Sequence, residues 1–187
     1  MSMRITVVSL VLALQGCNAA ASANQRSEVV ELQAKTTTLN SSALPVGAQM
    51  PAVTMSLQDG FEFPLAALTG KLIAVYFCAA DDDPACVREA RGLRDHWHEL
   101  HENHHVAMFG ISSRDAATRR AYVAKHKIEF DLAQDADGSI ARAFGVPTQG
   151  PFAPHTFLIG RDGKVQRVWQ TADPDTHAAE ILALALD

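Results

Sequence analysis

Two continuous apolar runs of strand length constrain the fold of this chain more than any other feature. They are KLIAVYF, residues 71–77, and HVAMFGIS, residues 105–112. A strand with one face in water alternates apolar and polar residues, whereas an unbroken apolar run is typical of a central strand that is covered on both faces. We therefore expect a sheet with helices packed on its two sides.

Hairpin and helix patterns surround these two runs. The segment VTMSLQDGFEFPL predicts two short strands around Asp59-Gly60, a strong turn signal. The segment PHTFLIGRDGKVQRVWQ predicts a second hairpin, which turns at Asp162-Gly163. Helices are predicted over residues 84–103, 115–126, 138–144 and 174–186. This order predicts an α/β fold, a thioredoxin-like sandwich with an N-terminal β-hairpin extension.

The first residues predict an export signal. MSMRITVVSLVLALQGC has one basic residue, Arg4, then an apolar run from Ile5 to Leu14 that is too short to span a bilayer. Its end, LQGC, resembles a bacterial lipobox, which implies cleavage after residues 1–16 and a lipid on Cys17. The alternative is an ordinary signal that is cleaved later, after the alanines at 19–21.

The segment after Cys17 predicts a tether. Residues 17–45 are rich in Ala, Ser, Thr and Asn and have no sustained apolar period, so we expect a flexible link that ends where a domain over residues 46–187 begins. The expected location is a membrane-anchored lipoprotein that faces the periplasm or the cell exterior. The chain has 16 Lys and Arg against 21 Asp and Glu, a formal net charge of −5, which disfavours a nucleic-acid partner.

If Cys17 carries a lipid, Cys78 and Cys86 are the thiols that remain, and in an oxidising compartment such a pair is a disulfide or a chemical site. Asp83-Pro84 predicts a helix N-cap followed by proline in the first helical position, which puts Cys86 third in the helix. The helix dipole there favours a thiolate. The aspartates at 81–83 oppose it, and the Asp83 carboxylate would compete for the N–H of Cys86. The alternative is that Cys86 is a small buried helix residue.

Several segments carry a family resemblance. VGAQMPAVTMSLQDG, GKLIAVYF, DDDPACVREARGLRD, FGIS, DADGSIARAFGV and TFLIGRDGKVQRVW resemble, in the same order, the peroxiredoxins of the bacterioferritin comigratory type. The resemblance covers about residues 46–187. It implies that Cys86 is the peroxidatic cysteine, which attacks the peroxide O–O bond and becomes a sulfenic acid.

The chain departs from the family pattern around this cysteine. The family's loop proline and threonine are replaced by Ala79 and Asp83, and its distant arginine falls at Pro154 or His155. The usual position of the resolving cysteine holds Arg91, so the chain resembles a one-cysteine form.

Three other residues could act beside Cys86. Cys78 could resolve the oxidised cysteine only if the acidic loop folds back, and a buried strand residue is the alternative that we favour. Arg88, within one helical turn of Cys86, and His155 are candidate cations to support the thiolate, although each is more often a solvated or structural side chain.

The sequence therefore predicts an exported thiol peroxidase that reduces hydrogen peroxide or organic hydroperoxides through the single peroxidatic cysteine Cys86. Its partners would be the peroxide, an external thiol or thioredoxin-like reductant, and the membrane through the lipid anchor. The alternative is a catalytically weakened peroxiredoxin-fold module for redox sensing or binding, suggested by Ala79, Asp83 and Pro154.

No cofactor and no metal are expected. His98, His101 and His105 could share one face, but a helix end without a carboxylate or thiolate at fixed spacing is usually solvated. Copper delivery would need Cys-x-x-x-Cys, which Cys78 and Cys86 do not form.

Overall fold

The computed structural model describes residues 42–78, 83–149, 152 and 154–186. The predicted signal, Cys17 and most of the predicted tether lie outside these residues. The strands are β1 (Thr54–Leu57), β2 (Glu62–Pro64), β3 (Leu72–Phe77), β4 (Val106–Ser112), β5 (Asp131–Gln134), β6 (His155–Ile159) and β7 (Val165–Trp169). The helices are α2 (Pro84–Asp95), α3 (Ala116–His126), α4 (Ser139–Ala143) and α5 (His177–Ala185), with a 3₁₀ turn, η1 (Leu65–Leu68), and a π-helical turn, η2 (Glu99–Asn103).

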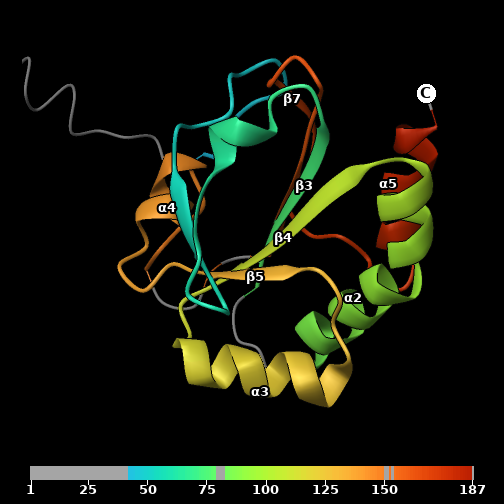
Figure 1. The fold of residues 1–187 in the computed structure, drawn as a ribbon. Coiled ribbons are helices and arrows are strands. Elements are labelled where there is room, and N and C mark those ends of the chain that lie inside the picture. The colour runs from blue at the N-terminus through green and yellow to red at the C-terminus, as the bar shows by residue number, and fades with distance from the viewer. Residues whose placement is uncertain (1–41, 79–82, 150–151, 153, 187) are drawn as a thin grey trace, which may run out of the picture. The chain divides into compact units, whose positions relative to one another are not determined.

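One sheet of seven strands, in the order β2-β1-β5-β4-β3-β6-β7, forms the centre of the domain (Figure 1). The predicted central strands β3 and β4 run parallel to each other, and β6 pairs antiparallel with the other edge of β3. All six residues of β3 are buried. Successive side chains of a strand point to opposite faces, so an unbroken apolar run shows that both faces of β3 are covered.

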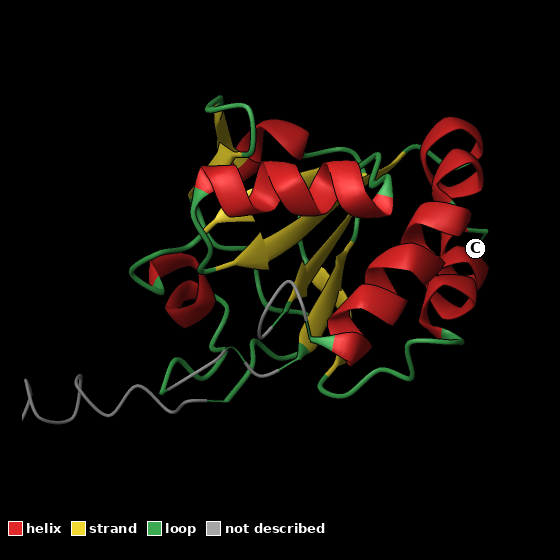
Figure 2. Cartoon of the chain, turned by 90° about the horizontal axis from the view of Figure 1, so that it is seen from below, coloured by secondary structure: helices red, strands yellow, loops and turns green. Residues whose placement is uncertain are grey.

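The two faces of the sheet carry separate cores. Ile73, Val75 and Phe77 of β3 pack into one core with residues of α4 and η1. Leu72, Ala74 and Tyr76 pack into the other core with residues of α2, α3 and α5. The sheet therefore lies between two helical layers, as the turned view in Figure 2 also shows. This is the α/β sandwich that the sequence predicts.

Both predicted hairpins are present. β1 pairs antiparallel with β2, and the turn between them contains Gly60 at φ 88°, where the Asp59 carboxylate accepts a hydrogen bond from the Phe61 N–H at 3.0 Å. β6 pairs antiparallel with β7 around Gly163, at φ 76°. A positive φ favours glycine, which explains the turn signal at both positions. The β1–β2 hairpin adds two strands beyond β5 and forms the expected N-terminal extension.

The prediction of one helix over residues 84–103 is wrong, because α2 ends at Asp95. The side chain of His96 explains the end: its Nδ1 lies 2.9 Å from the carbonyl oxygen of Gly92, the acceptor that the next helical N–H would use. The N–H of His96 bonds to the Leu93 carbonyl instead. The chain continues into the π-helical turn η2.

Strand β5 is absent from the elements that the sequence predicts. This strand has only four residues and its outer two, Asp131 and Gln134, are polar. Part of its hydrogen bonding comes from Gln58, the residue directly after β1, whose side chain accepts from the Leu132 N–H at 2.7 Å and donates to Asp131 at 3.1 Å.

The described part of the domain includes residues slightly before the predicted boundary at residue 46. The N–H of Leu44 donates to the carbonyl of Phe144 at 3.0 Å, and Ala43 and Leu44 pack against the core on the α4 face. The last residues of the predicted tether are therefore part of the domain. Within the described ranges, no helix has both the length and the apolar character needed to cross a membrane.

Candidate active site

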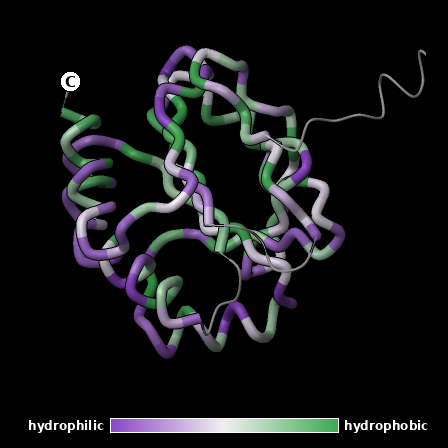
Figure 3. The backbone as a smooth tube through the Cα atoms, turned by 180° about the vertical axis from the view of Figure 1, so that it is seen from behind, coloured by the Kyte–Doolittle hydropathy of each residue, from purple (hydrophilic) through white to green (hydrophobic). Residues whose placement is uncertain are grey.

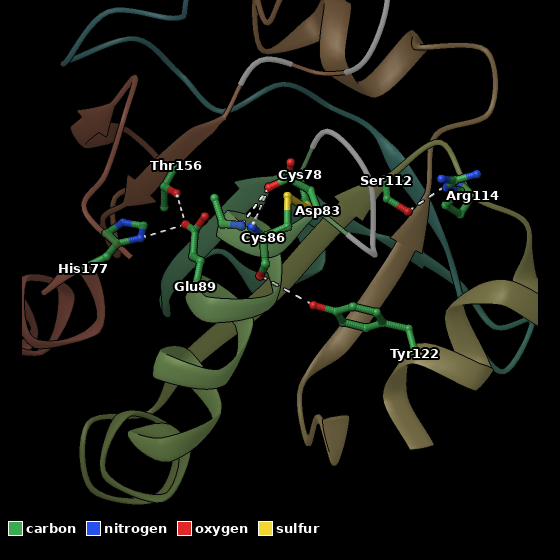
Figure 4. The surroundings of a disulfide bond; sticks show 10 residues. Cys78, Asp83, Cys86, Glu89, Ser112, Arg114, Tyr122, Thr156 and His177 are labelled. Atoms are coloured by element: carbon green, nitrogen blue, oxygen red, sulfur yellow. Dashed lines mark hydrogen bonds and ion pairs between the residues drawn. A yellow bond between two sulfur atoms is a disulfide. The ribbon is translucent and has the colours of Figure 1, made fainter. Parts of the chain in front are cut away.

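Cys86 lies in the first turn of α2, at the position that the sequence predicts. Asp83 is the N-cap and Pro84 is the first helical residue. One carboxylate oxygen of Asp83 accepts hydrogen bonds from the N–H of Ala85 at 2.8 Å and of Cys86 at 3.2 Å (Figure 4). Asp83 therefore occupies the donors that a thiolate at this helix start would use. Asp81 and Asp82 lie outside the described residues, so their effect on Cys86 stays a prediction.

Cys86 is joined to Cys78 by a disulfide, with the two Cα atoms 5.8 Å apart. The one-cysteine form is therefore not confirmed, and Cys78 is buried, as the favoured alternative expected, but it is bonded to Cys86. Cys78 directly follows β3, and its side chain faces the core under α2, as does Cys86. A helix that follows a parallel strand begins beside that strand's carboxyl end, which brings the two sulfurs together. Because α2 still begins at Pro84, the disulfide does not require this helix to unwind.

Both cysteines are nearly enclosed, with 6% of Cys78 and 4% of Cys86 exposed. The hydroxyl of Tyr122 on α3 donates to the carbonyl oxygen of Cys86 at 3.5 Å. A cavity of about 10 Å³, room for about one water molecule, borders Cys78 and is lined mainly by Tyr76, Gly110, Ser112 and Tyr122. The disulfide thus lies under the molecular surface, next to a small cavity that contains hydroxyl groups.

The two candidate cations lie apart from Cys86. Arg88 is exposed, and residues two apart on a helix point to nearly opposite sides. His155 is buried on β6, opposite Phe77, and stacks on Phe157, so it belongs to the other core. Arg88 therefore faces solvent and His155 packs on the other face of the sheet, and the predicted support of the thiolate by either residue stays a prediction. Arg91, at the family's usual resolving position, lies with its guanidinium 3.2 Å from Nδ1 of His126.

Three residues that the sequence analysis did not single out form a buried polar cluster below the disulfide. Glu89 on α2 lies 2.8 Å, through Oε1, from Nδ1 of His177 at the start of α5. The hydroxyl of Thr156 on β6 donates to the same oxygen at 3.4 Å. The sequence did contain one signal: Glu89 interrupts the buried face of α2 that also contains Cys86, Ala90 and Leu93.

The histidine-rich segment makes other contacts than metal ligation. His98 pairs with Glu102 at 3.3 Å, His104 pairs with Glu99 at 3.2 Å, and His101 stacks on Trp97. In the part of the chain that the structure describes, no group of three or more His, Cys, Asp or Glu is arranged to hold a metal ion.

A cysteine pair between the end of a central strand and the start of the next helix, in a thioredoxin-like sheet, is typical of a thiol-redox protein. The chain belongs to the AhpC/TSA family, whose sequence profile matches residues 46–168. It is 30% identical over 148 residues to a Coxiella burnetii protein that is named as a peroxiredoxin, bcp, a match that covers 75% of this chain and 97% of that one. It is 28% identical over 185 residues to the chloroplastic peroxiredoxin Q of Triticum aestivum, which covers 97% of this chain and 85% of the relative.

Solved structures agree with this assignment. The crystal structure of peroxidoxin BcpB from Mycobacterium tuberculosis matches with a TM-score of 0.71 and 26% identity over 76% of this chain and 97% of that one. A structure of Xanthomonas campestris peroxiredoxin Q shares the fold, with a TM-score of 0.69 and 23% identity over 79% of this chain and 98% of the other. The chain is a peroxiredoxin of the bacterioferritin comigratory type, a class of thiol-dependent peroxidases, and the predicted fold and family are confirmed.

Proposed function

We propose that this chain is an exported thiol peroxidase, held to the membrane by a lipid on Cys17, in which Cys86 attacks hydrogen peroxide or an organic hydroperoxide. Membership of the family and the position of Cys86 in the first turn of α2 support the choice of nucleophile. The export signal and the anchor rest on the sequence of residues 1–17.

The disulfide supports a reaction cycle in which Cys78 also takes part. The Cys86 thiolate attacks one peroxide oxygen, the O–O bond breaks, and the other oxygen leaves with a proton as water or an alcohol, so that Cys86 becomes a sulfenic acid. The Cys78 thiol then attacks the Cys86 sulfur, which releases water and forms the disulfide. An external dithiol or thioredoxin-like reductant returns both cysteines to thiols and is itself oxidised. This cycle has one peroxidatic cysteine, as the sequence predicts, but it also uses Cys78.

Two observations favour the second candidate, a weakened peroxiredoxin that serves as a redox sensor or binding module. Asp83 takes the hydrogen bond of the Cys86 N–H, and Cys86 is only 4% exposed. A thiolate there has a like charge beside it and little access for peroxide. Such a site would change redox state slowly, as a sensor can.

Peroxide consumption under a dithiol reductant tests the two candidates. We expect steady turnover by the wild type, none by Cys86→Ser, and a single fast turnover followed by slow recycling in Cys78→Ser. Equal steady rates for Cys78→Ser and the wild type would remove Cys78 from the cycle. Oxidation of Cys86 that is complete only after many minutes at millimolar peroxide would favour the sensor.

A further inference from the structure

A carboxylate and an imidazole meet below the disulfide, deep in the core. Glu89 lies three residues after Cys86 and therefore on the same face of α2. The side chains of His177 and Glu89 are 0% and 9% exposed, and their polar atoms are 2.8 Å apart, as Figure 4 shows. Apolar side chains of similar size often fill such a position with equal or better stability. The presence of two ionisable groups under Cys86 therefore needs an explanation other than packing.

The hydrogen bonding of His177 limits the charge of this pair. Its Nε2 is buried and has no hydrogen-bond partner among the described residues. A protonated ring would leave a charged N–H unsatisfied there, which is costly. In a neutral ring, Nδ1–H donates to Glu89 and Nε2 is a bare acceptor, a cheaper arrangement. While Cys86 is held in the disulfide, the pair therefore carries one net negative charge, on Glu89.

Reduction of the disulfide changes this balance. Side chains three residues apart on a helix have their Cβ atoms about 5–6 Å from each other. A thiolate at Cys86 would thus form close to the Glu89 carboxylate, in an interior where like charges repel strongly. A proton added to the pair removes its net charge and with it most of its repulsion of the Cys86 thiolate. The cost is an Nε2–H of His177 without an acceptor among the described residues, which the weaker repulsion offsets.

We propose that the Glu89–His177 pair takes up the proton that Cys86 releases, so that the thiolate forms next to a pair without net charge. This inference rests on the proposed role of Cys86. The Cys86 S–H bond breaks and the proton goes to the pair. After the thiolate has attacked and the O–O bond has broken, the pair releases its extra proton to solvent. The leaving oxygen takes up a proton from solvent. Glu89 and His177 do not touch the peroxide. They are positioning residues, which act on the reaction by setting the charge next to Cys86.

Other charged groups face the pair from the surrounding elements. Asp83 caps α2, Arg167 of β7 lies over Trp169 at 5.7 Å, and Trp169 in turn packs its ring 5.1 Å from that of His177. Glu180 of α5 is exposed, and it accepts a hydrogen bond from Trp169 at 2.8 Å. Asp173, exposed, accepts through its main chain from the His177 N–H. Of the charged groups named here, Glu89 and His177 are the ones that are buried.

The test measures how the alkylation rate of Cys86 depends on pH in the reduced full chain, with peptide mass spectrometry to separate Cys86 from Cys17 and Cys78. Glu89→Gln removes the negative charge and keeps an acceptor for His177, so we expect the midpoint to fall by about one to two pH units. His177→Gln keeps a donor for Glu89 but removes the proton acceptor, so we expect the midpoint to rise by a similar amount. Glu62→Gln, an exposed carboxylate on β2 at the far edge of the sheet, is the matched control and should not move it.

Shifts in the same direction for both variants, or a control that shifts as far as they do, would overturn the proposal. A second measurement avoids variants of the pair, in case they do not fold. This measurement follows the ring ¹⁵N chemical shifts of His177, assigned through bonds, against pH. The reduced wild type should keep its imidazole proton to higher pH than the reduced Cys86→Ser variant does. Coincident titrations of the two proteins would also overturn the proposal. Neither experiment uses peroxide, so a failure of the proposed function would leave both results interpretable.

Discussion

Asp83 should slow the reaction of Cys86, and its replacement should speed that reaction. The Asp83 carboxylate caps α2 and bonds to the N–H of Cys86 at 3.2 Å. For unit charges about 6 Å apart, Coulomb's law gives about 0.7 kcal/mol in water and about 3 kcal/mol at an effective dielectric constant near 20. Asp83 is half-buried, so we take about 1.4 kcal/mol, which corresponds to about one unit in the pKa of the Cys86 thiol.

Two substitutions separate charge from capping. Asp83→Asn keeps a capping oxygen without the charge, and Asp83→Thr also introduces the residue type that the family resemblance expects, each with a small cost in helix stability. Both should lower the pKa of the Cys86 thiol and raise the rate of sulfenic acid formation near pH 6 by about three- to tenfold. Stopped-flow kinetics against pH on the reduced proteins measures this. If both variants are slower than the wild type, Asp83 assists the reaction, as a proton acceptor would, and the argument from like charges is wrong.

Three further predictions follow from other parts of the chain. Gly110→Ala should lower the free energy of unfolding by about 1–3 kcal/mol in urea denaturation, because a Cβ there would lie 2.6 Å from Leu132 and 2.7 Å from Tyr76; an unchanged midpoint would show that this core relaxes. Burial, with smaller contributions from Arg91, Lys125 and Arg94, lowers the pKa of His126 below its usual 6.5. The folding stability that neutral His126 provides is therefore full above pH 6.5 and is lost as the pH falls through the lower pKa of the folded state. The loss should be smaller in His126→Gln, and an identical loss would assign it to other groups. Labelled fatty acid should appear on the wild type in the membrane fraction and be absent from Cys17→Ala, and equal labelling of the two would exclude Cys17 as the lipid site.

Local signals explain what the sequence could predict. The apolar run of β3, the glycines of the two hairpins and the Asp83-Pro84 start of α2 each depend on residues close together in the chain. The N-cap is the clearest case, because Asp83 accepts from N–H groups two and three residues ahead. The position of Cys86 in the first turn followed directly from it.

Contacts between distant residues explain what the sequence could not predict. β5 is short and has polar ends, and it exists as a strand because β1 and β4 pair with it. The Cys78–Cys86 bond depends on the start of α2 lying beside the end of β3 and on both side chains facing one core. The Glu89–His177 contact joins residues 88 positions apart, and neither residue alone suggests the other.

The central claim is that Cys86 is the peroxidatic cysteine and Cys78 its partner. Its most direct test treats the reduced full chain with one equivalent of peroxide in the presence of dimedone and identifies the modified cysteines by peptide mass spectrometry. We expect a Cys78–Cys86 disulfide peptide from the wild type, a dimedone adduct on Cys86 from Cys78→Ser, and no oxidation at the site in Cys86→Ser. The contradicting result is a dimedone adduct on Cys78 in the Cys86→Ser variant. It would have to form as fast as the adduct on Cys86 forms in the Cys78→Ser variant.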